Sequence, residues 1–138
     1  MTIRVIGVLA YDRDRVLLVR HTGASPHSVG KYGIPGGRLQ EGESEKAACI
    51  RKLCSETGFM ITENDLVEMP KIYSANILIK NRIENFSMKS YVCNSWQGNL
   101  VADEPEVIPE WVSMYDMSHY TLLPNVGEII NDGLVFRR

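Results

Sequence analysis

The chain has 138 residues, of which 44% are hydrophobic, so it is long enough for one domain with a sizeable core and too short for two. Its 15 basic residues nearly balance its 17 acidic residues, so its overall charge draws it neither to nucleic acid nor to an anionic membrane. We therefore expect a single domain over residues 1–138, with any binding of anions confined to a local site.

The three cysteines are odd in number and lack Cys-x-x-Cys spacing, which argues against a disulfide framework and a zinc site. The amino terminus enters a strand-like pattern without the hydrophobic region of a signal peptide, and no apolar run is long enough to span a membrane. These features predict a soluble protein of the reducing cytoplasm, without a membrane partner.

The first part of the chain predicts an antiparallel hairpin. Two apolar runs, at 3–11 and 16–20, flank a polar turn at 12–15. The second run ends at Arg20 and His21 and leads into a polar loop.

A glycine-rich loop and a helix are predicted next. Gly36 and Gly37 permit backbone conformations and close approaches that are closed to other residues. Ser44 suits a helix N-cap, and Gly58 suits a C-cap. On a helical wheel one face is apolar, formed by Ala47, Ile50, Leu53 and Cys54, and the other is polar, formed by Glu45, Lys52, Ser55 and Glu56.

The remainder of the chain predicts a meander and a final helix. Residues 66–80 form a bent or edge strand interrupted by Pro70, and a turn at 81–85 separates it from a strand at 86–93. Residues 94–109 are expected to form an acidic loop before a short strand. That strand covers 111–114, and the helix after it has a capping box formed by Asn125 and Glu128.

The glycine-rich loop and helix carry a long motif. The residues on the motif's positions are Gly37, Glu43, Arg51, Leu53, Glu56 and Gly58, with Phe59 at the closing apolar place. This stretch resembles the Nudix box, written G-x5-E-x7-R-E-U-x-E-E-x-G-U, where U is a bulky aliphatic residue. The preceding residues 32–37 and the acidic residues 41–43 resemble the usual lead-in to that box, and the flanking strands also suit the family. The resemblance therefore covers essentially the whole chain.

The resemblance implies the fold class α/β (α+β), with an α/β/α sandwich around a central mixed, largely antiparallel sheet. It also implies hydrolysis of the pyrophosphate bond in a nucleoside diphosphate linked to another group, assisted by magnesium, with manganese as an alternative. Divalent cations neutralise the phosphate oxygens while a carboxylate orients the attacking water. The expected ligand is thus a small nucleotide or nucleoside-diphosphate derivative. Many family members pair as homodimers, but no exposed stripe here can be assigned to an interface.

The resemblance also assigns roles to residues of the box. The Gly37 carbonyl, Glu43 and Glu56 are the expected metal ligands, with Glu43 and Glu56 also in the catalytic set. Arg51 belongs to that set because the family arginine orients the neighbouring glutamates, and this role is structural even in an active enzyme. Gly36 and Gly37 are expected beside the phosphates of the substrate.

Two carboxylates of the family pattern are missing from this chain. Lys52 and Ser55 stand where the family has glutamate, so metal affinity should fall, and Lys52 can pair with Glu56 four residues later. Lys52 is therefore also a candidate to contact substrate phosphate directly. The depleted box leaves two functions open, a weak pyrophosphohydrolase and a domain that binds a nucleotide and hydrolyses little.

An acidic residue from the later loop can compensate for the missing carboxylates, as in many family members. Asp103, Glu104 and Glu106 are the candidates, and we place Glu104 and Glu106 in the catalytic set. A solvated acidic loop is the alternative interpretation of all three residues.

Other candidates lie outside the box. Arg20 and His21 are the substrate-binding candidates at the end of the hairpin, and the loop adds His27 and Lys31, although a solvated loop explains each of them singly. Two aromatic residues, Tyr32 and Trp111, are expected in the core rather than stacked on a base, and Cys49 and Cys54 are expected to be small packing residues.

Overall fold

The computed structural model describes residues 1–23 and 28–138 of the chain. Seven strands form one mixed sheet in the order β3-β2-β1-β6-β5, with β4 paired to β1 and β7 paired to β2. The parallel pair is β1 with β6, and the other pairs are antiparallel. The strands are β1 (Thr2–Asp12), β2 (Arg15–His21), β3 (Tyr32–Gly33), β4 (Gly36–Arg38), β5 (Leu66–Ile79), β6 (Arg82–Cys93) and β7 (Val107–Ser113).

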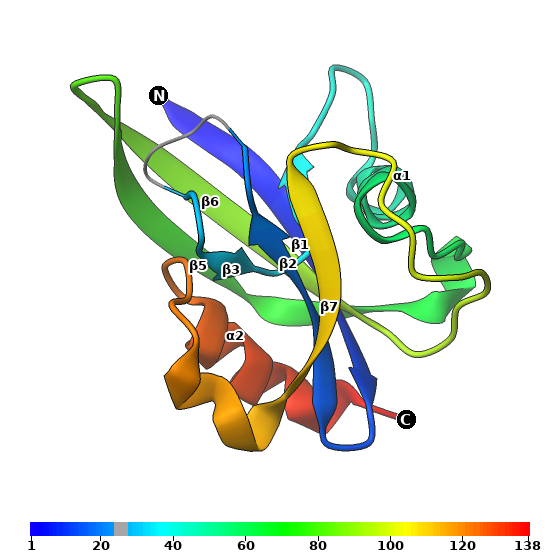
Figure 1. Ribbon diagram of the computed structural model, residues 1–138. Helices are drawn as coiled ribbons and strands as arrows, with labels where there is room; N and C mark the ends of the chain where they lie inside the picture. Colours follow the sequence, from blue (N-terminus) through cyan, green and yellow to red (C-terminus); the bar gives the residue numbers. More distant parts are fainter. Residues whose placement is uncertain (24–27) are drawn as a thin grey trace.

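Two α-helices cover opposite faces of the sheet (Figure 1). Alternation along β1 explains this arrangement, because successive strand residues point to opposite faces. Ile6 and Val8 pack in the cluster that contains α1, whereas Leu9 and Tyr11 pack in the cluster that contains α2. The expected three-layer α+β sandwich around a mixed sheet is confirmed. The helices are α1 (Glu45–Thr57) and α2 (Val126–Gly133), with short 3-10 turns η1 (Glu63–Asp65), η2 (Met114–His119) and η3 (Leu134–Phe136).

Helix α1 begins and ends where its capping residues predict. The Ser44 side chain accepts a hydrogen bond of 3.1 Å from the Ala47 amide at the first turn. Gly58 adopts a left-handed conformation, with φ of 82°, and its amide donates to the Cys54 carbonyl at 2.8 Å. An added Cβ at Gly58 would lie 2.4 Å from the Asn99 carbonyl oxygen, so a larger residue would also clash there.

The predicted packing face of α1 is wrong in part. Cys54 is exposed, whereas Glu56, assigned to the polar face, is only 4% exposed. A wheel built on hydrophobicity places glutamate outward, but the Gly36 amide and Lys52 are partners of the Glu56 carboxylate and offset part of its loss of hydration. The buried residues of α1 are Ala48, Cys49, Leu53, Glu56 and Thr57.

The hairpin of β5 and β6 has a tighter turn than the sequence predicts. Lys80 and Asn81 both have positive φ, at 50° and 64°, so a two-residue turn closes the hairpin. The turn predicted at 81–85 is therefore too long, because β6 already begins at Arg82. The bend expected at Pro70 is confirmed by a register shift in that part of β5.

The final strand and helix also differ from their predictions. β7 begins at Val107 rather than 111 because it pairs with β2 along its whole length. The capping box of α2 is wrong, since Asn125 makes no side-chain cap and its amide donates instead to the Ser74 carbonyl at 2.9 Å. Glu128 forms an ion pair with Lys71 on β5. Both side chains tie α2 to the hairpin.

The two aromatic residues expected in the core, Trp111 and Tyr32, are partly buried and pack against it. The Trp111 ring lies beside the rings of Trp96 and Phe59, with centroid distances of 5.7 and 6.2 Å. It packs against the core cluster that includes the buried residues of α1. Tyr32 packs edge-on against Tyr120 at 4.9 Å on the opposite side of the sheet. Within residues 1–23 and 28–138, no helix has the length and apolar character needed to cross a membrane.

Candidate active site

The glycine loop lies against the centre of the sheet because β4 pairs with β1. Gly36 approaches the backbone of β1 so closely that an added Cβ would lie 2.0 Å from the Ile6 carbonyl oxygen, which explains the glycine. The Gly36 amide donates to Glu56 Oε1 at 2.8 Å. This contact fixes the last turns of α1 to the loop.

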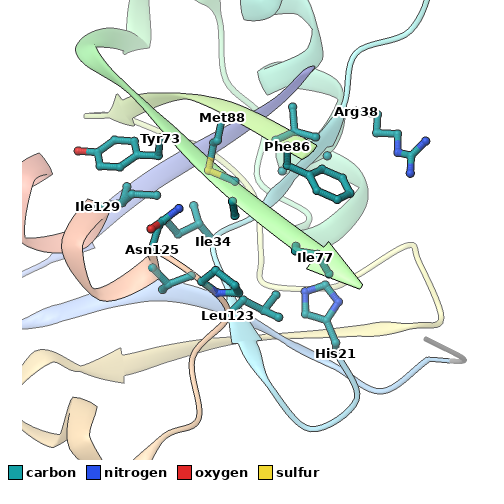
Figure 2. Close-up of a pocket in the computed structure, with 17 residues that line it drawn as sticks. His21, Ile34, Arg38, Tyr73, Ile77, Phe86, Met88, Leu123, Asn125 and Ile129 are labelled. Carbon is teal, nitrogen blue, oxygen red and sulfur yellow. The ribbon is translucent and has the colours of Figure 1, made fainter. Parts of the chain in front are cut away.

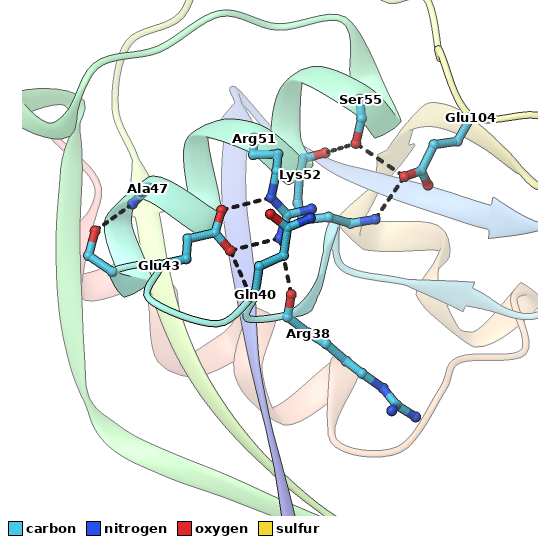
Figure 3. A network of polar contacts seen from close by, with 9 residues as sticks. Arg38, Gln40, Glu43, Ala47, Arg51, Lys52, Ser55 and Glu104 are labelled. Carbon is cyan, nitrogen blue, oxygen red and sulfur yellow. Dashed lines mark hydrogen bonds and ion pairs between the residues drawn. The ribbon is translucent and has the colours of Figure 1, made fainter.

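Glu43 and Arg51 form a two-point ion pair at the start of the site (Figure 3). Arg51 Nε donates to Glu43 Oε2 at 2.7 Å, and Arg51 Nη2 donates to Glu43 Oε1 at 2.9 Å. Hydrogen bonds from Arg51, together with one from the Gln40 amide, lower the pKa of Glu43 to about 2. Glu43 is thus ionised at neutral pH, and both of its oxygens are occupied by Arg51.

Lys52 lies between two carboxylates further along α1. Its Nζ atom is 3.7 Å from Glu56 Oε2, which matches the pairing expected from their spacing. A second partner was not expected, since Nζ donates to Glu104 Oε1 at 2.9 Å. The Ser55 hydroxyl donates to the same Glu104 oxygen at 3.3 Å. Both replacements of family glutamates therefore contact Glu104 (Figure 3).

The two carboxylates beside Lys52 have opposite pKa shifts. Burial raises the pKa of Glu56 to about 7, and the charge of Lys52 and the Gly36 amide offset only part of this effect. Burial also disfavours ionisation of Glu104, but the hydrogen bond and charge of Lys52 outweigh it and hold the pKa of Glu104 below its ordinary value. At neutral pH Glu104 is ionised, whereas Glu56 is poised to take up or release a proton.

The acidic loop reaches the site because its backbone amides donate hydrogen bonds to carbonyl groups in the last turn of α1. The Val101 amide donates to the Thr57 carbonyl at 2.9 Å, and the Asp103 and Glu104 amides donate to the Ser55 carbonyl at 2.8 and 3.2 Å. These bonds occupy carbonyls that have no partner within the helix. Of the three candidate acids, Glu104 faces Lys52, whereas Asp103 is exposed.

A small polar cavity of 160 Å³ opens beside Glu56 and Glu104. Glu106 also lines this cavity, together with His21 at the end of β2. Three carboxyl groups and an imidazole group therefore border one space. The full lining comprises His21, Gly23, Ser28, Glu56, Glu104, Glu106 and Val107.

A larger and mainly apolar pocket of 270 Å³ lies on the other side of the glycine loop (Figure 2). Its walls come from β5, β6, the start of α2 with the residues just before it, and the segment from β3 to β4, with single residues from β1 and β2. The Arg38 guanidinium lies 5.9 Å from the centre of the Phe86 ring, at one edge of the pocket. Its labelled walls in Figure 2 include Ile34, Tyr73, Ile77, Phe86, Met88, Leu123, Asn125 and Ile129.

The two spaces share one border. His21 lines both of them, and Gly36 and Gly37, which line the apolar pocket, contact the residues beside the polar cavity. Gly36 binds Glu56, and an added Cβ at Gly37 would lie 2.8 Å from Lys52 Cε. A ligand with an apolar ring and an anionic chain would therefore find both environments within one site.

Two other loop and strand candidates lie outside this arrangement. Arg20 forms an ion pair with Glu110 at 3.7 Å and lines neither space. Lys31 also lies outside both linings, although its amide helps to close the loop by donating to the Ser28 carbonyl at 3.0 Å. His27 lies outside the described residues.

Sequence reasoning missed the walls of the apolar pocket. The alternation in 86–93 places Phe86 and Met88 on one face of a strand, which is a usable signal. It does not show that this face looks toward the glycine loop. That fact follows from the pairing of β6 with β1, in which Phe86 aligns with Ile3 and Met88 with Val5.

The side chains present do not fit a divalent metal ion as they are arranged. Magnesium takes about six oxygen ligands at about 2.1 Å. Here Arg51 occupies both oxygens of Glu43, and the Lys52 ammonium group lies between Glu56 and Glu104. In the part of the chain that the structure describes, no three His, Cys, Asp or Glu side chains form a group that could hold a metal. We therefore derive no catalytic step through a metal ion.

Comparison with known proteins agrees with the fold and the motif. The family model described as "NUDIX domain" matches residues 1–132. The uncharacterized Nudix hydrolase YvcI of Bacillus subtilis is 26% identical over 131 residues, which cover 93% of this chain and 77% of that protein.

Solved structures show the same fold. A MutT NUDIX hydrolase from Burkholderia pseudomallei superimposes with a TM-score of 0.79 at 17% identity, covering 96% of this chain and 98% of the other. The NUDIX domain of Shewanella oneidensis NrtR, solved in complex with ADP ribose, gives a TM-score of 0.77 at 17% identity, covering 99% and 88%. Because the family match spans nearly the whole chain, this protein belongs to the Nudix hydrolase family.

Proposed function

We propose that this protein binds a nucleoside-diphosphate derivative and slowly hydrolyses its pyrophosphate bond. The observation that carries the proposal is the shared border of the two spaces. Gly36 and Gly37 line an apolar pocket large enough for a base or sugar, and they contact Glu56 and Lys52 on the other side. A nucleotide placed with its base in the pocket has its phosphates beside a cation and a buried carboxylate.

The roles of the residues follow from their chemistry. The Phe86 ring stacks on the base through the face that is not covered by the Arg38 guanidinium. Lys52 donates to phosphate oxygens and reduces the charge that an attacking water meets. Glu56, with a pKa of about 7, accepts the proton as the water oxygen bonds to phosphorus and the bridging P–O bond breaks. Glu104 holds Lys52 in position.

The magnesium requirement that the resemblance implies stays a prediction. The Gly37 carbonyl, Glu43 and Glu56 are its expected ligands, yet the present partners of the two carboxylates are Arg51 and Lys52. We expect a low rate of hydrolysis with or without magnesium. A single ammonium group supplies less positive charge to the phosphates than a pair of divalent ions does. Among candidate substrates, ADP-ribose is the first to test, since the NrtR domain with this fold was solved with it.

The test is a hydrolysis screen over ADP-ribose, nucleoside triphosphates, oxidised nucleotides and dinucleotides, each with magnesium, manganese or EDTA. We expect turnover of at least one substrate, and a loss of roughly 100-fold or more in Glu56→Ala. Glu63→Ala is the matched control, because Glu63 is exposed on η1 and lines neither space. Turnover in Glu56→Ala that equals the control would contradict the role of Glu56.

A second function is favoured by one observation, the ion pairs of Lys52 with Glu56 and Glu104. They neutralise the carboxylates that hydrolysis would use, so a domain that binds a nucleotide without hydrolysing it is the alternative. The double variant Lys52→Glu, Ser55→Glu separates the two functions. The alternative function, binding without hydrolysis, is supported if the natural chain turns over none of the substrates and the double variant shows magnesium-dependent turnover.

A further inference from the structure

We propose that the Lys52 ammonium group is a built-in cation that takes the place of a divalent metal ion in this site. The inference rests on the proposed binding of a phosphorylated ligand. It explains why the glycines, the caps, Glu43 and Glu56 of the box are present while two of its other carboxylates are replaced by Lys52 and Ser55. A ligand would then be bound by the protein's own charge, without a metal.

The position of Lys52 is the first support. Nζ lies 2.9 Å from Glu104 Oε1 and 3.7 Å from Glu56 Oε2, so it lies between two of the carboxylates that line the polar cavity. The side chain is only 14% exposed, unlike the usual solvated lysine. An ion placed between the same oxygens would meet the ammonium group.

The second support is that the side chain is held in place along its length. Its methylene groups lie against Gly37, where an added Cβ would be 2.8 Å from Cε and 3.3 Å from Cδ. The Ser55 hydroxyl donates to the same Glu104 oxygen that accepts from Lys52. The loop backbone then fixes Glu104 to the end of α1 through the Ser55 carbonyl. Both departures from the box thus serve one ion-paired cluster.

The third support is the remaining capacity of the ammonium group. It has three donors, and one of them is directed at Glu104. Because the lysine side chain packs against Gly37, which lines the apolar pocket, a phosphate oxygen bound beside Gly37 is the proposed acceptor of another. Compared with a metal ion, this cation is tied covalently to the chain, so it needs no free metal and does not leave with the product.

Binding of manganese alone gives the first test, measured by the electron paramagnetic resonance signal of free Mn²⁺. Lys52→Glu replaces the cation by a carboxylate beside Glu56 and Glu104, and we expect it to bind Mn²⁺ at least about tenfold more tightly than the natural chain. Lys46→Glu, which makes the same charge change six residues earlier on α1, should bind Mn²⁺ as weakly as the natural chain. Equal affinities of the natural chain and Lys52→Glu, or an equal gain in Lys46→Glu, would overturn the proposal.

Lys52→Met covers the case in which Lys52→Glu does not fold, because it keeps the length of the side chain and removes only the charge. We expect this variant also to gain Mn²⁺ affinity, by roughly tenfold. A Lys52→Met protein that folds and gains nothing would overturn the proposal.

The second test is calorimetric titration of the natural chain with ADP-ribose in EDTA and in magnesium. We expect the two dissociation constants to agree within about twofold, since a difference of 1.4 kcal/mol would already be about tenfold. Binding that is tenfold or more tighter with magnesium would overturn the inference. Absence of binding in both buffers contradicts the proposed ligand and leaves the manganese measurement to decide the role of Lys52.

Discussion

The apolar pocket and the polar cavity differ in how strongly each depends on a few residues. The walls of the pocket are mainly apolar and come from several elements, and apolar side chains tolerate exchanges that conserve volume. The polar cavity is lined by Glu56 and Glu104, which both pair with Lys52. Substitutions in the apolar pocket and substitutions among the charged residues can therefore change ligand binding and hydrolysis independently. A box with altered carboxylates does not imply a lost ligand.

Phe86→Ala should have the largest effect at the apolar end. Base–aromatic stacking contributes about 1–3 kcal/mol, so affinity for ADP-ribose should fall roughly tenfold to 100-fold. Calorimetric titration measures this change. Ile83→Ala is the control, because Ile83 is an exposed apolar residue on the same strand. An equal, small change in both variants would contradict a stacking role for Phe86.

Glu56→Gln tests the polar end through the dependence of stability on pH. The pKa of Glu56 rises from its ordinary value of 4.5 to about 7 on folding because the carboxyl group is buried. Between these values the folded chain holds more protons than the unfolded chain, so the contribution of Glu56 to stability falls as pH rises from about 4.5 to 7. The neutral amide of glutamine removes this dependence and can still accept from the Gly36 amide.

The expected size follows from about 1.4 kcal/mol for each pKa unit. The free energy of unfolding of Glu56→Gln, relative to that of the natural chain, should be about 2 kcal/mol larger at pH 8 than at pH 5, so the variant is relatively more stable at pH 8. Urea unfolding followed by circular dichroism at both pH values measures the difference. A relative stability that is the same at pH 5 and pH 8 would show that Glu56 titrates normally in the folded chain.

Arg20→Ala should have the smallest effect on ligand affinity, because Arg20 lies outside the linings of both spaces. Arg20 forms a half-exposed ion pair with Glu110, a type of contact that contributes about 0–1 kcal/mol. Affinity for ADP-ribose should change by less than about threefold. A loss as large as that of Phe86→Ala would mean that phosphate lies along β2 and not beside Lys52.

The sequence predicts the scaffold of the site better than its charges. Ser44 and Gly58 mark the ends of α1 because caps act locally, and the hairpin at the amino terminus follows from alternation. The pairing of Lys52 with Glu56 is also local, since the two residues are one helical turn apart. Such contacts depend on near neighbours in the chain.

The rest depends on contacts between distant residues. Glu104 reaches Lys52 across 52 positions because the acidic loop docks on the end of α1. Glu56 is buried by its contact with Gly36, which reverses the face expected from hydrophobicity. Phe86 enters the pocket through the parallel pairing of β6 with β1. No local pattern contains this information, whereas a list of strand pairs would supply most of it.

The central claim is that the two spaces form one site, with the base at Phe86 and the phosphates at Lys52. Calorimetric titration of Phe86→Ala and Lys52→Met with ADP-ribose, adenosine and inorganic pyrophosphate tests this claim most directly. We predict that Phe86→Ala weakens binding of ADP-ribose and adenosine but not pyrophosphate, and that Lys52→Met weakens binding of ADP-ribose and pyrophosphate but not adenosine. The claim that the two spaces form one site would be contradicted if only one variant lost affinity for ADP-ribose. It would also be contradicted if each variant lost the same affinity for all three ligands.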